Sequence, residues 1–393
     1  MLPLQGIRVI DVTTNISGPS LTMILADLGA EVIKIERPGI GDEARKMAPL
    51  VKEDGTFFLN INRNKKSVVL NLQLQETKEV IYELIRDADI FVENYRLGKA
   101  DKLGLGYDTL KSLNKGLIYC SLTAYGQKGP SKHKPGYDAI LQAETGLMSM
   151  TGSDQLARVP VSILDQGSAV WGALGILAAL LQRKENGQGQ KVETSLFETG
   201  VYWVGYHLLS TMLTGQNPEK LGSNHASFAP YGALQTADVP IMIGISNDRL
   251  FEKLCEVVEK QHWVKDERFT SNVSRVQNRR LLNEKLEDIL RTKKAEDWLA
   301  ALEEQGVPSA MIQQMTDVAM HPQTLSNKML INSEHPNNGN IRLTRLPITL
   351  SSVDLKVRNT PPALGEHTVE VLKALGKSEV EIERLMNMQA LQN

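Results

Sequence analysis

Asp165 is the residue whose type and position best suit catalysis. It stands in SILDQGSAVWGALGILAALLQR, directly before an apolar stretch that predicts a helix over residues 167–183. The positive end of that helix would favour an ionised carboxylate, which is a nucleophile toward acyl groups. Backbone N–H groups near Gln166 and Gly167 could stabilise the resulting oxyanions. The alternative is that Asp165 only caps the helix, and position alone does not decide between the two roles.

Two polar segments follow predicted strands. Glu36-Arg37-Pro38 comes after a strand at 31–35, and Asn94-Tyr95-Arg96 comes after a strand at 89–92. Ligands of parallel sheets gather at the carboxyl ends of the strands. Arg37 is therefore a candidate phosphate contact, with a solvated loop arginine as the alternative. The same two interpretations apply to residues 94–96.

Several other kinds of site are not indicated. There is no GxSxG, P-loop, HExxH or EF-hand motif, the seven histidines form no i, i+4 pair, and the two cysteines form no CxxC pair. We therefore expect no metal centre and no disulfide. A net charge of −2 gives no reason to expect nucleic acid or an anionic membrane as a partner. The apolar stretch at 169–181 is shorter than the roughly 18–20 residues of a membrane span, and the N-terminus lacks signal-peptide features, so we expect a cytoplasmic protein.

The first half of the chain alternates strand-like and helix-like segments, which predicts an α/β fold with a mostly parallel sheet. The expected strands lie at residues 6–12, 31–35, 67–72, 89–92, 117–122 and 190–195, and the expected helices at 19–28, 76–86, 167–183 and 198–213. From residue 222 a β-hairpin region precedes three helices, at 249–259, 279–291 and 294–305. Strand-like pieces and two helices end the chain. We expect a large domain of residues 1–222 with 327–393, and a smaller one of residues 223–326.

Ordered blocks along nearly the whole chain resemble the family III CoA-transferases, which include formyl-CoA transferase, carnitine CoA-transferase and α-methylacyl-CoA racemase. The blocks include LQGIRVIDVTTNISGPS, FFLNINRNKKSVVLNL, DIFVENYRLGKADKLGLGYDTL, GYDAILQAETGLMSMTG and ILDQGSAVWGALGILAALLQR. The resemblance implies a Rossmann-like large domain built from both ends of the chain. It also implies a smaller inserted α+β domain and an interlocked homodimer.

The resemblance also assigns roles to residues. Asp165 matches the catalytic aspartate, and Arg37 matches the arginine that meets the adenine and phosphate end of CoA. Lys102 stands near a basic CoA contact, and Tyr137 would line the pocket beside the aspartate. The further CoA contacts that the resemblance implies are Ile16, Ser17, Leu70, Asn71, Leu72, Gln73, Asn94, Tyr95 and Arg96. CoA would be a substrate, and neither a metal nor a permanently bound cofactor is implied.

Two departures from the family pattern narrow the activity. Racemase members carry His-Asp where this chain has Tyr137-Asp138, so the histidine acid/base is missing. Gly244-Ile-Ser-Asn247 stands in place of the tetraglycine loop of formyl-CoA transferase, which disfavours formyl or oxalyl specificity. We expect CoA transfer from a short-chain acyl-CoA, such as succinyl-CoA, to a small carboxylic or dicarboxylic acid. The alternatives are an α-methylacyl-CoA racemase or epimerase and a CoA-binding protein without turnover.

Overall fold

The structure is a computed structural model that describes residues 1–390. The chain forms two compact units. The first consists of Met1–Leu147, Val159–Leu209 and the chain from Pro322 onward, and the second of Met148–Arg158 and Ser210–His321. The expected smaller domain, residues 223–326, starts 13 residues after and ends five residues after the main segment of the second unit, Ser210–His321, and the short segment Met148–Arg158 was not expected in the second unit.

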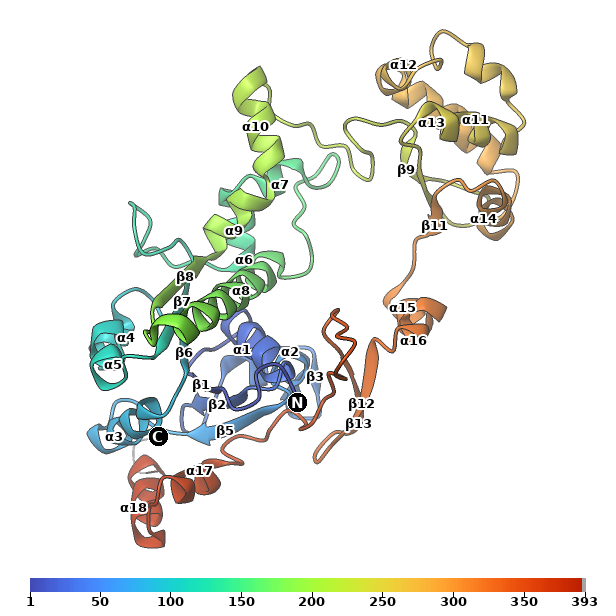
Figure 1. The fold of residues 1–393 in the computed structure, drawn as a ribbon. Helices are drawn as coiled ribbons and strands as arrows, with labels where there is room; N and C mark the ends of the chain where they lie inside the picture. The colour runs from blue at the N-terminus through green and yellow to red at the C-terminus, as the bar shows by residue number, and fades with distance from the viewer. Residues whose placement is uncertain (391–393) are drawn as a thin grey trace. The chain divides into compact units, whose positions relative to one another are not determined.

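A six-stranded sheet forms the centre of the first unit (Figure 1), and each predicted strand is present in it. The strands are β1 (Arg8–Asp11), β2 (Glu31–Glu36), β5 (Lys65–Val69), β6 (Ile90–Glu93), β7 (Ile118–Thr123) and β8 (Lys191–Ser195). Their order is β5-β2-β1-β6-β7-β8, and all neighbours pair in parallel. β1 therefore lies between β2 and β6, where the winding of the chain changes direction. Such a point leaves a crevice for ligands at the carboxyl ends of the strands.

Helices cover both faces of this sheet (Figure 1). Successive strand residues point to opposite sides, so neighbouring apolar residues of one strand pack on different faces. Val9 packs on one side with α1 (Ser17–Asp27) and α8 (Ile163–Asn186). Ile10 packs on the other side, which is covered mainly by α3 (Gln75–Arg86), α5 (Tyr107–Leu113), α17 (Thr368–Ala374) and α18 (Glu379–Ala390).

Helix α8 begins at Ile163, four residues before the predicted start, so Asp165 lies inside its first turn. By length and composition the helix could cross a membrane, because it is 24 residues long and extends beyond the apolar stretch at 169–181; core helices of this length and composition also occur in proteins that do not cross a membrane. Half of its most apolar window is buried, and it packs against α1, β7 and β8.

The helix predicted at 198–213 is two helices, α9 (Leu196–Trp203) and α10 (Gly205–Thr214). Val204 separates them at the end of α9, directly before Gly205, a residue that weakens helices.

The second unit contains the predicted hairpin, β9 (Tyr231–Leu234) with β10 (Ile241–Gly244), and β10 also pairs with the unpredicted β11 (Ser309–Met311). Its core lies between this sheet and the three predicted helices, α11 (Asp248–Val257), α13 (Arg279–Leu290) and α14 (Ala295–Glu304).

In the first unit, β12 (Leu330–His335) and β13 (Gly339–Thr344) form a second hairpin. The shorter elements are η1 (Glu43–Lys46), β3 (Leu50–Val51), β4 (Asp54–Gly55), α2 (Thr56–Ile61), α4 (Lys99–Lys102), α6 (Asp138–Glu144), α7 (Leu147–Met150), η2 (Gln261–Lys265), α12 (Asn272–Gln277), α15 (Met315–Met320) and α16 (Pro322–Ser326).

Candidate active site

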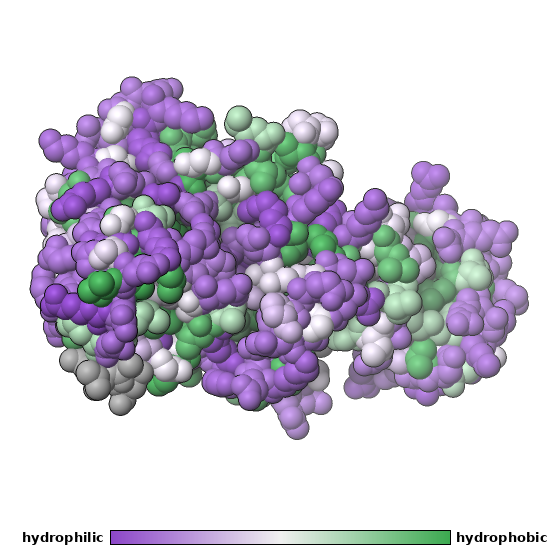
Figure 2. Space-filling view, turned by 90° about the horizontal axis from the view of Figure 1, so that it is seen from below, coloured by the Kyte–Doolittle hydropathy of each residue, from purple (hydrophilic) through white to green (hydrophobic). Residues whose placement is uncertain are grey.

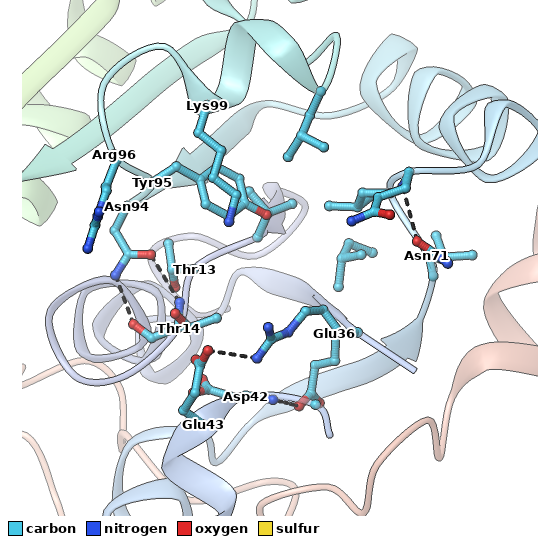
Figure 3. A pocket seen from close by; sticks show the side chains of 18 residues that line it. Thr13, Thr14, Glu36, Asp42, Glu43, Asn71, Asn94, Tyr95, Arg96 and Lys99 are labelled. Atoms are coloured by element: carbon cyan, nitrogen blue, oxygen red, sulfur yellow. Dashed lines mark hydrogen bonds and ion pairs between the residues drawn. The ribbon is translucent and has the colours of Figure 1, made fainter. Parts of the chain in front are cut away.

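A pocket of about 280 Å³ lies at the carboxyl ends of four neighbouring strands, β1, β2, β5 and β6 (Figure 3). Residues from all four strand ends line it, because parallel strands end at the same edge of the sheet. Of the residues predicted from the sequence, the structure brings together Arg37, Leu70, Asn71, Leu72, Gln73, Asn94, Tyr95 and Arg96 in this lining.

Cationic side chains border the pocket. The Arg37 guanidinium is half exposed and forms a 2.7 Å ion pair with Glu43, which also lines the pocket. The Lys99 ammonium lies 4.7 Å from the centre of the Tyr95 ring. A cation that is exposed or held by a single surface pair is available to a phosphate at little cost.

Lys99 is a lining residue that the sequence analysis missed. It opens the short helix α4, whose last residue is the predicted Lys102. Lys102 is exposed and is not among the residues that line the pocket. The two lysines are three residues apart on one helix, and residues at this spacing are neighbours on the helix surface. The spacing could therefore have predicted Lys99 as a second basic residue beside Lys102.

A buried ionic network supports the loop after β1. The Lys34 ammonium binds Asp42 at 2.9 Å and the Thr13 carbonyl at 2.8 Å, and the Lys65 ammonium binds Asp11 at 3.2 Å. All of these side chains are buried. Burial opposes ionisation of Asp11, but Lys34 and then Lys65 lower its pKa to about 2. Breaking a buried pair leaves an uncompensated charge, so the network fixes the loop in one position.

The same loop connects the pocket with Asp165. Asn94 accepts a hydrogen bond from the Thr14 N–H at 3.0 Å and donates one to the Thr14 carbonyl at 2.8 Å (Figure 3). The Asn15 N–H donates to Asp42 at 2.9 Å. The loop then ends at the buried Ser17, whose side chain acts through hydrogen bonding to lower the pKa of Asp165.

Asp165 does not cap α8, so that interpretation is wrong. The cap position belongs to Ser162, which makes no capping bond through its side chain. The buried carboxylate of Asp138, on α6, accepts instead from the N–H groups of Leu164 at 2.7 Å and of Asp165 at 3.2 Å.

The pKa of Asp165 also differs from the expectation. Burial, followed by the charge of Asp138, raises this pKa to about 7, and the hydrogen bond from Ser17 lowers it only in part. Two N–H groups of the helix terminus are already bound to Asp138, so they do not hold Asp165 ionised. The Gln166 N–H is bound to the Ser162 carbonyl at 2.9 Å, so the predicted oxyanion contact is not free either.

Two predicted residues lie near these groups in the chain without lining the pocket. Ile16 is half-buried at the start of α1, directly before Ser17. Tyr137 is 73% exposed at the start of α6, directly before Asp138. Their contacts with a ligand stay predictions. Within residues 1–390, no cluster of three metal-ligating side chains is present.

Comparison with known proteins identifies the family of this chain. The family model for CoA-transferase family III matches residues 4–368. The succinyl-CoA:glutarate CoA-transferase of Mus musculus is 36% identical, over 98% of this chain and 89% of that protein. The succinate–glutarate CoA-transferase of Agrobacterium fabrum is 32% identical, over 95% of this chain and 96% of that one.

A solved structure has the same fold. The crystal structure of a CAIB/BAIF family protein from Brucella suis superimposes with a TM-score of 0.86 at 33% identity, covering 95% of this chain and 99% of that one. The matches extend over nearly the full length of the chain. The half-buried aspartate at the start of a central helix and the pocket at four strand ends are compatible with the family that these matches indicate. This chain is an enzyme of CoA-transferase family III.

Proposed function

We propose that this enzyme moves CoA from succinyl-CoA, or another short-chain acyl-CoA, to a small dicarboxylic acid, with Asp165 as the covalently acylated residue. The names of the relatives support the substrate class. They specify glutarate in the mouse and Agrobacterium proteins and mesaconate in a protein of Haloarcula hispanica. Both acids are short and carry two carboxylates. CoA is a substrate in this proposal, and no permanent cofactor takes part.

The observation that carries the role of Asp165 is its setting. The carboxylate is half-buried in the first turn of α8, and burial followed by the charge of Asp138 raises its pKa to about 7. Such a carboxylate is more basic than an exposed aspartate, and basicity strengthens a nucleophile, while much of it remains ionised at neutral pH.

The proposed reaction begins with attack of an Asp165 oxygen on the thioester carbonyl. The C–S bond breaks, its electron pair leaves on the CoA sulfur, and a mixed anhydride remains. The thiolate then attacks the aspartyl carbonyl, which releases the donor acid and leaves CoA on Asp165 as a thioester. The acceptor carboxylate reverses these two steps and leaves as the new acyl-CoA.

The first test is trapping. Parent enzyme mixed with succinyl-CoA and hydroxylamine, without an acceptor, should give a hydroxamate on the peptide that contains Asp165, seen by mass spectrometry. Asp165→Ala should abolish transfer and the label, whereas Glu185→Ala, an exposed carboxylate on the same helix, should change neither. Undiminished turnover in Asp165→Ala, or a label on another carboxylate, would contradict the assignment.

A second test addresses the acceptor class. Succinyl-CoA and acetyl-CoA are offered with a panel of monocarboxylic and dicarboxylic acids, and the acyl-CoA products are identified by mass spectrometry. We expect the highest kcat/KM with short dicarboxylic acids. A preference for monocarboxylic acids would refute the acceptor class without affecting the role of Asp165.

The proposal extends to architecture. The first unit acts as a Rossmann-like CoA-binding domain, the second unit acts as a smaller α+β domain inserted in its sequence, and two chains interlock as a homodimer in the cytoplasm. The strand order β5-β2-β1-β6-β7-β8 supports the first statement. Large apolar side chains exposed on α8, α9 and α10 support the dimer, and two buried free cysteines agree with a reducing compartment.

A further inference from the structure

The Asp138 carboxylate holds the first turn of α8 from outside that helix. One of its oxygens accepts from the N–H groups of Leu164 and Asp165, at 2.7 and 3.2 Å. The first N–H groups of a helix have no partner within it, and Ser162 at the cap position supplies none through its side chain. A buried residue of α6 therefore fixes the backbone that carries Asp165.

A fully buried glutamine fixes Asp138 in turn. The Gln142 amide nitrogen donates to the other oxygen of Asp138 at 2.5 Å and to the Val159 carbonyl at 3.2 Å. The Gln142 amide oxygen accepts from the Val159 N–H at 2.9 Å. Because Val159 lies just before α8, the glutamine joins α6 to the segment that leads into that helix.

These bonds leave the charge of Asp138 in place, because their donors are two peptide N–H groups and one amide, all neutral. Asp138 and Asp165 are thus two carboxylates near one helix terminus, and like charges disfavour the ionised form. The other acidic groups on the elements packed against α8 interact elsewhere: Glu198 with Ser195, Glu193 with Lys191, Asp27 with Arg63, and Glu144 on α6 with Tyr125. Burial first, and then Asp138, raise the pKa of Asp165 to about 7.

We propose that Asp138 is a positioning residue of the CoA-transfer reaction, which anchors the turn that carries Asp165 and keeps a fixed negative charge beside its carboxylate. This inference rests on the proposed role of Asp165. When Asp165 attacks the thioester, the C–S bond breaks, the negative charge passes to the departing sulfur, and the new anhydride linkage is neutral. The repulsion from Asp138 is therefore relieved as the bond forms, which lowers the barrier to acylation.

Two variants separate the charge from the anchor. Asp138→Asn can keep one oxygen toward α8 but loses both the charge and the bond from Gln142. Gln142→Ala loses the same bond and keeps the charge. The measurements are the pH profile of kcat/KM, whose acid limb reports ionisation of the free enzyme, and the single-turnover rate of acylation with succinyl-CoA.

In Asp138→Asn the acid limb should move to lower pH by about one unit, the size of a close like-charge effect. The acylation rate above pH 8 should fall by about tenfold, since relief of repulsion is lost and Asp165 is less basic. In Gln142→Ala acylation should slow without a shift of the acid limb. Glu185→Gln, at the far end of α8, should change neither quantity.

An acid limb that stays in place in Asp138→Asn, together with a parental acylation rate, would overturn the role of Asp138. If that variant does not fold, a shifted acid limb in Gln142→Ala would overturn the assignment of the shift to charge, and an unchanged acylation rate would overturn the anchor. Hydroxylamine trapping in the parent enzyme distinguishes the two proposals. A label on another carboxylate removes both, whereas a label on Asp165 with an unmoved limb removes only the role of Asp138.

Discussion

At neutral pH the Asp165 carboxyl is divided between its protonated and ionised forms, because burial and the charge of Asp138 raise its pKa to about 7. The ionised Asp165 therefore lowers the free energy of unfolding of the protein. An exposed aspartate would be fully ionised, but it would also be a weaker base and a weaker nucleophile. This loss of stability should be measurable as a change in the free energy of unfolding.

Replacement of Asp165 by asparagine should stabilise the folded protein at alkaline pH. The pKa is higher in the folded chain than in the unfolded one, so the favourable contribution of Asp165 is complete below pH 4 and is lost as pH rises through 7. Asp165→Asn should therefore gain about 1–2 kcal/mol at pH 8, after allowance for partial exposure, and almost nothing at pH 4. Urea unfolding at the two pH values measures this, and a gain that does not depend on pH would contradict it.

Arg37 should contribute to CoA affinity more than to chemistry. Its guanidinium borders the pocket and is held only by a half-exposed pair with Glu43, so a phosphate can replace that partner. Loss of a charge-assisted bond costs roughly 1.5–3 kcal/mol, so Arg37→Ala should raise the Kd of CoA about tenfold or more. Calorimetry with CoA provides the measurement. Arg280→Ala, exposed in the second unit, is the control, and equal Kd values for the parent and Arg37→Ala would refute the assignment.

At the scale of elements, the strands and the first-unit pocket could be predicted because their signals are local. Short runs of β-branched residues predicted the strands. The polar residues directly after them, such as Arg37 and Asn94, predicted the position of the pocket. The start of α8 could not be predicted, since its N–H groups are satisfied by Asp138, which lies 26 and 27 residues earlier in the chain than the residues it binds. The raised pKa of Asp165 was missed because its causes, burial and then the charge of Asp138, both come from residues that are remote in sequence. A capping residue remote in sequence leaves no pattern beside the helix that it caps.

Helix α8 also depends on close packing beside the nucleophile. A Cβ on Gly167 would lie 2.4 Å from the Trp203 ring of α9 and 2.8 Å from a methyl group of Thr199. Gly167→Ala gains up to about 1 kcal/mol in helix propensity but overpacks the contact at a cost of about 1–3 kcal/mol. We expect a net loss of about 1 kcal/mol and a lower rate of acylation, since the turn that carries Asp165 must shift. Urea unfolding and single-turnover kinetics measure the two effects, and a variant more stable than the parent would contradict the expectation.

For the whole molecule, exposed apolar side chains are the main unexplained feature. Hydrophilic side chains predominate on the face that Figure 2 shows. Many large apolar side chains are nevertheless more than half exposed. On α8, α9 and α10 these are Val170, Leu174, Leu181, Tyr202, Tyr206, Leu209, Met212 and Leu213. Side chains of this kind and number are typical of a buried interface between chains.

We expect a homodimer of about twice the 43.5-kDa chain mass, with α10 in its interface. Leu213→Asp, at a side chain 78% exposed, should weaken the dimer because it buries an unpaired charge. Val380→Asp, at a side chain 76% exposed on α18, should leave the dimer unchanged. Sedimentation velocity measures both, and a parent protein that is a stable, active monomer at low concentration would contradict the dimer.

The pocket at the four strand ends has a kinetic consequence for the proposed reaction. Its lining includes neither Asp165 nor Ser17, so under the proposal it binds a part of CoA that does not react. After the C–S bond breaks, the thiolate remains tethered to the protein through the nucleotide end. A short flexible tether gives an effective concentration on the order of millimolar, so recapture by the aspartyl group outpaces escape into solution. Added free CoA bearing an isotopic label should therefore exchange into the product only slowly during turnover.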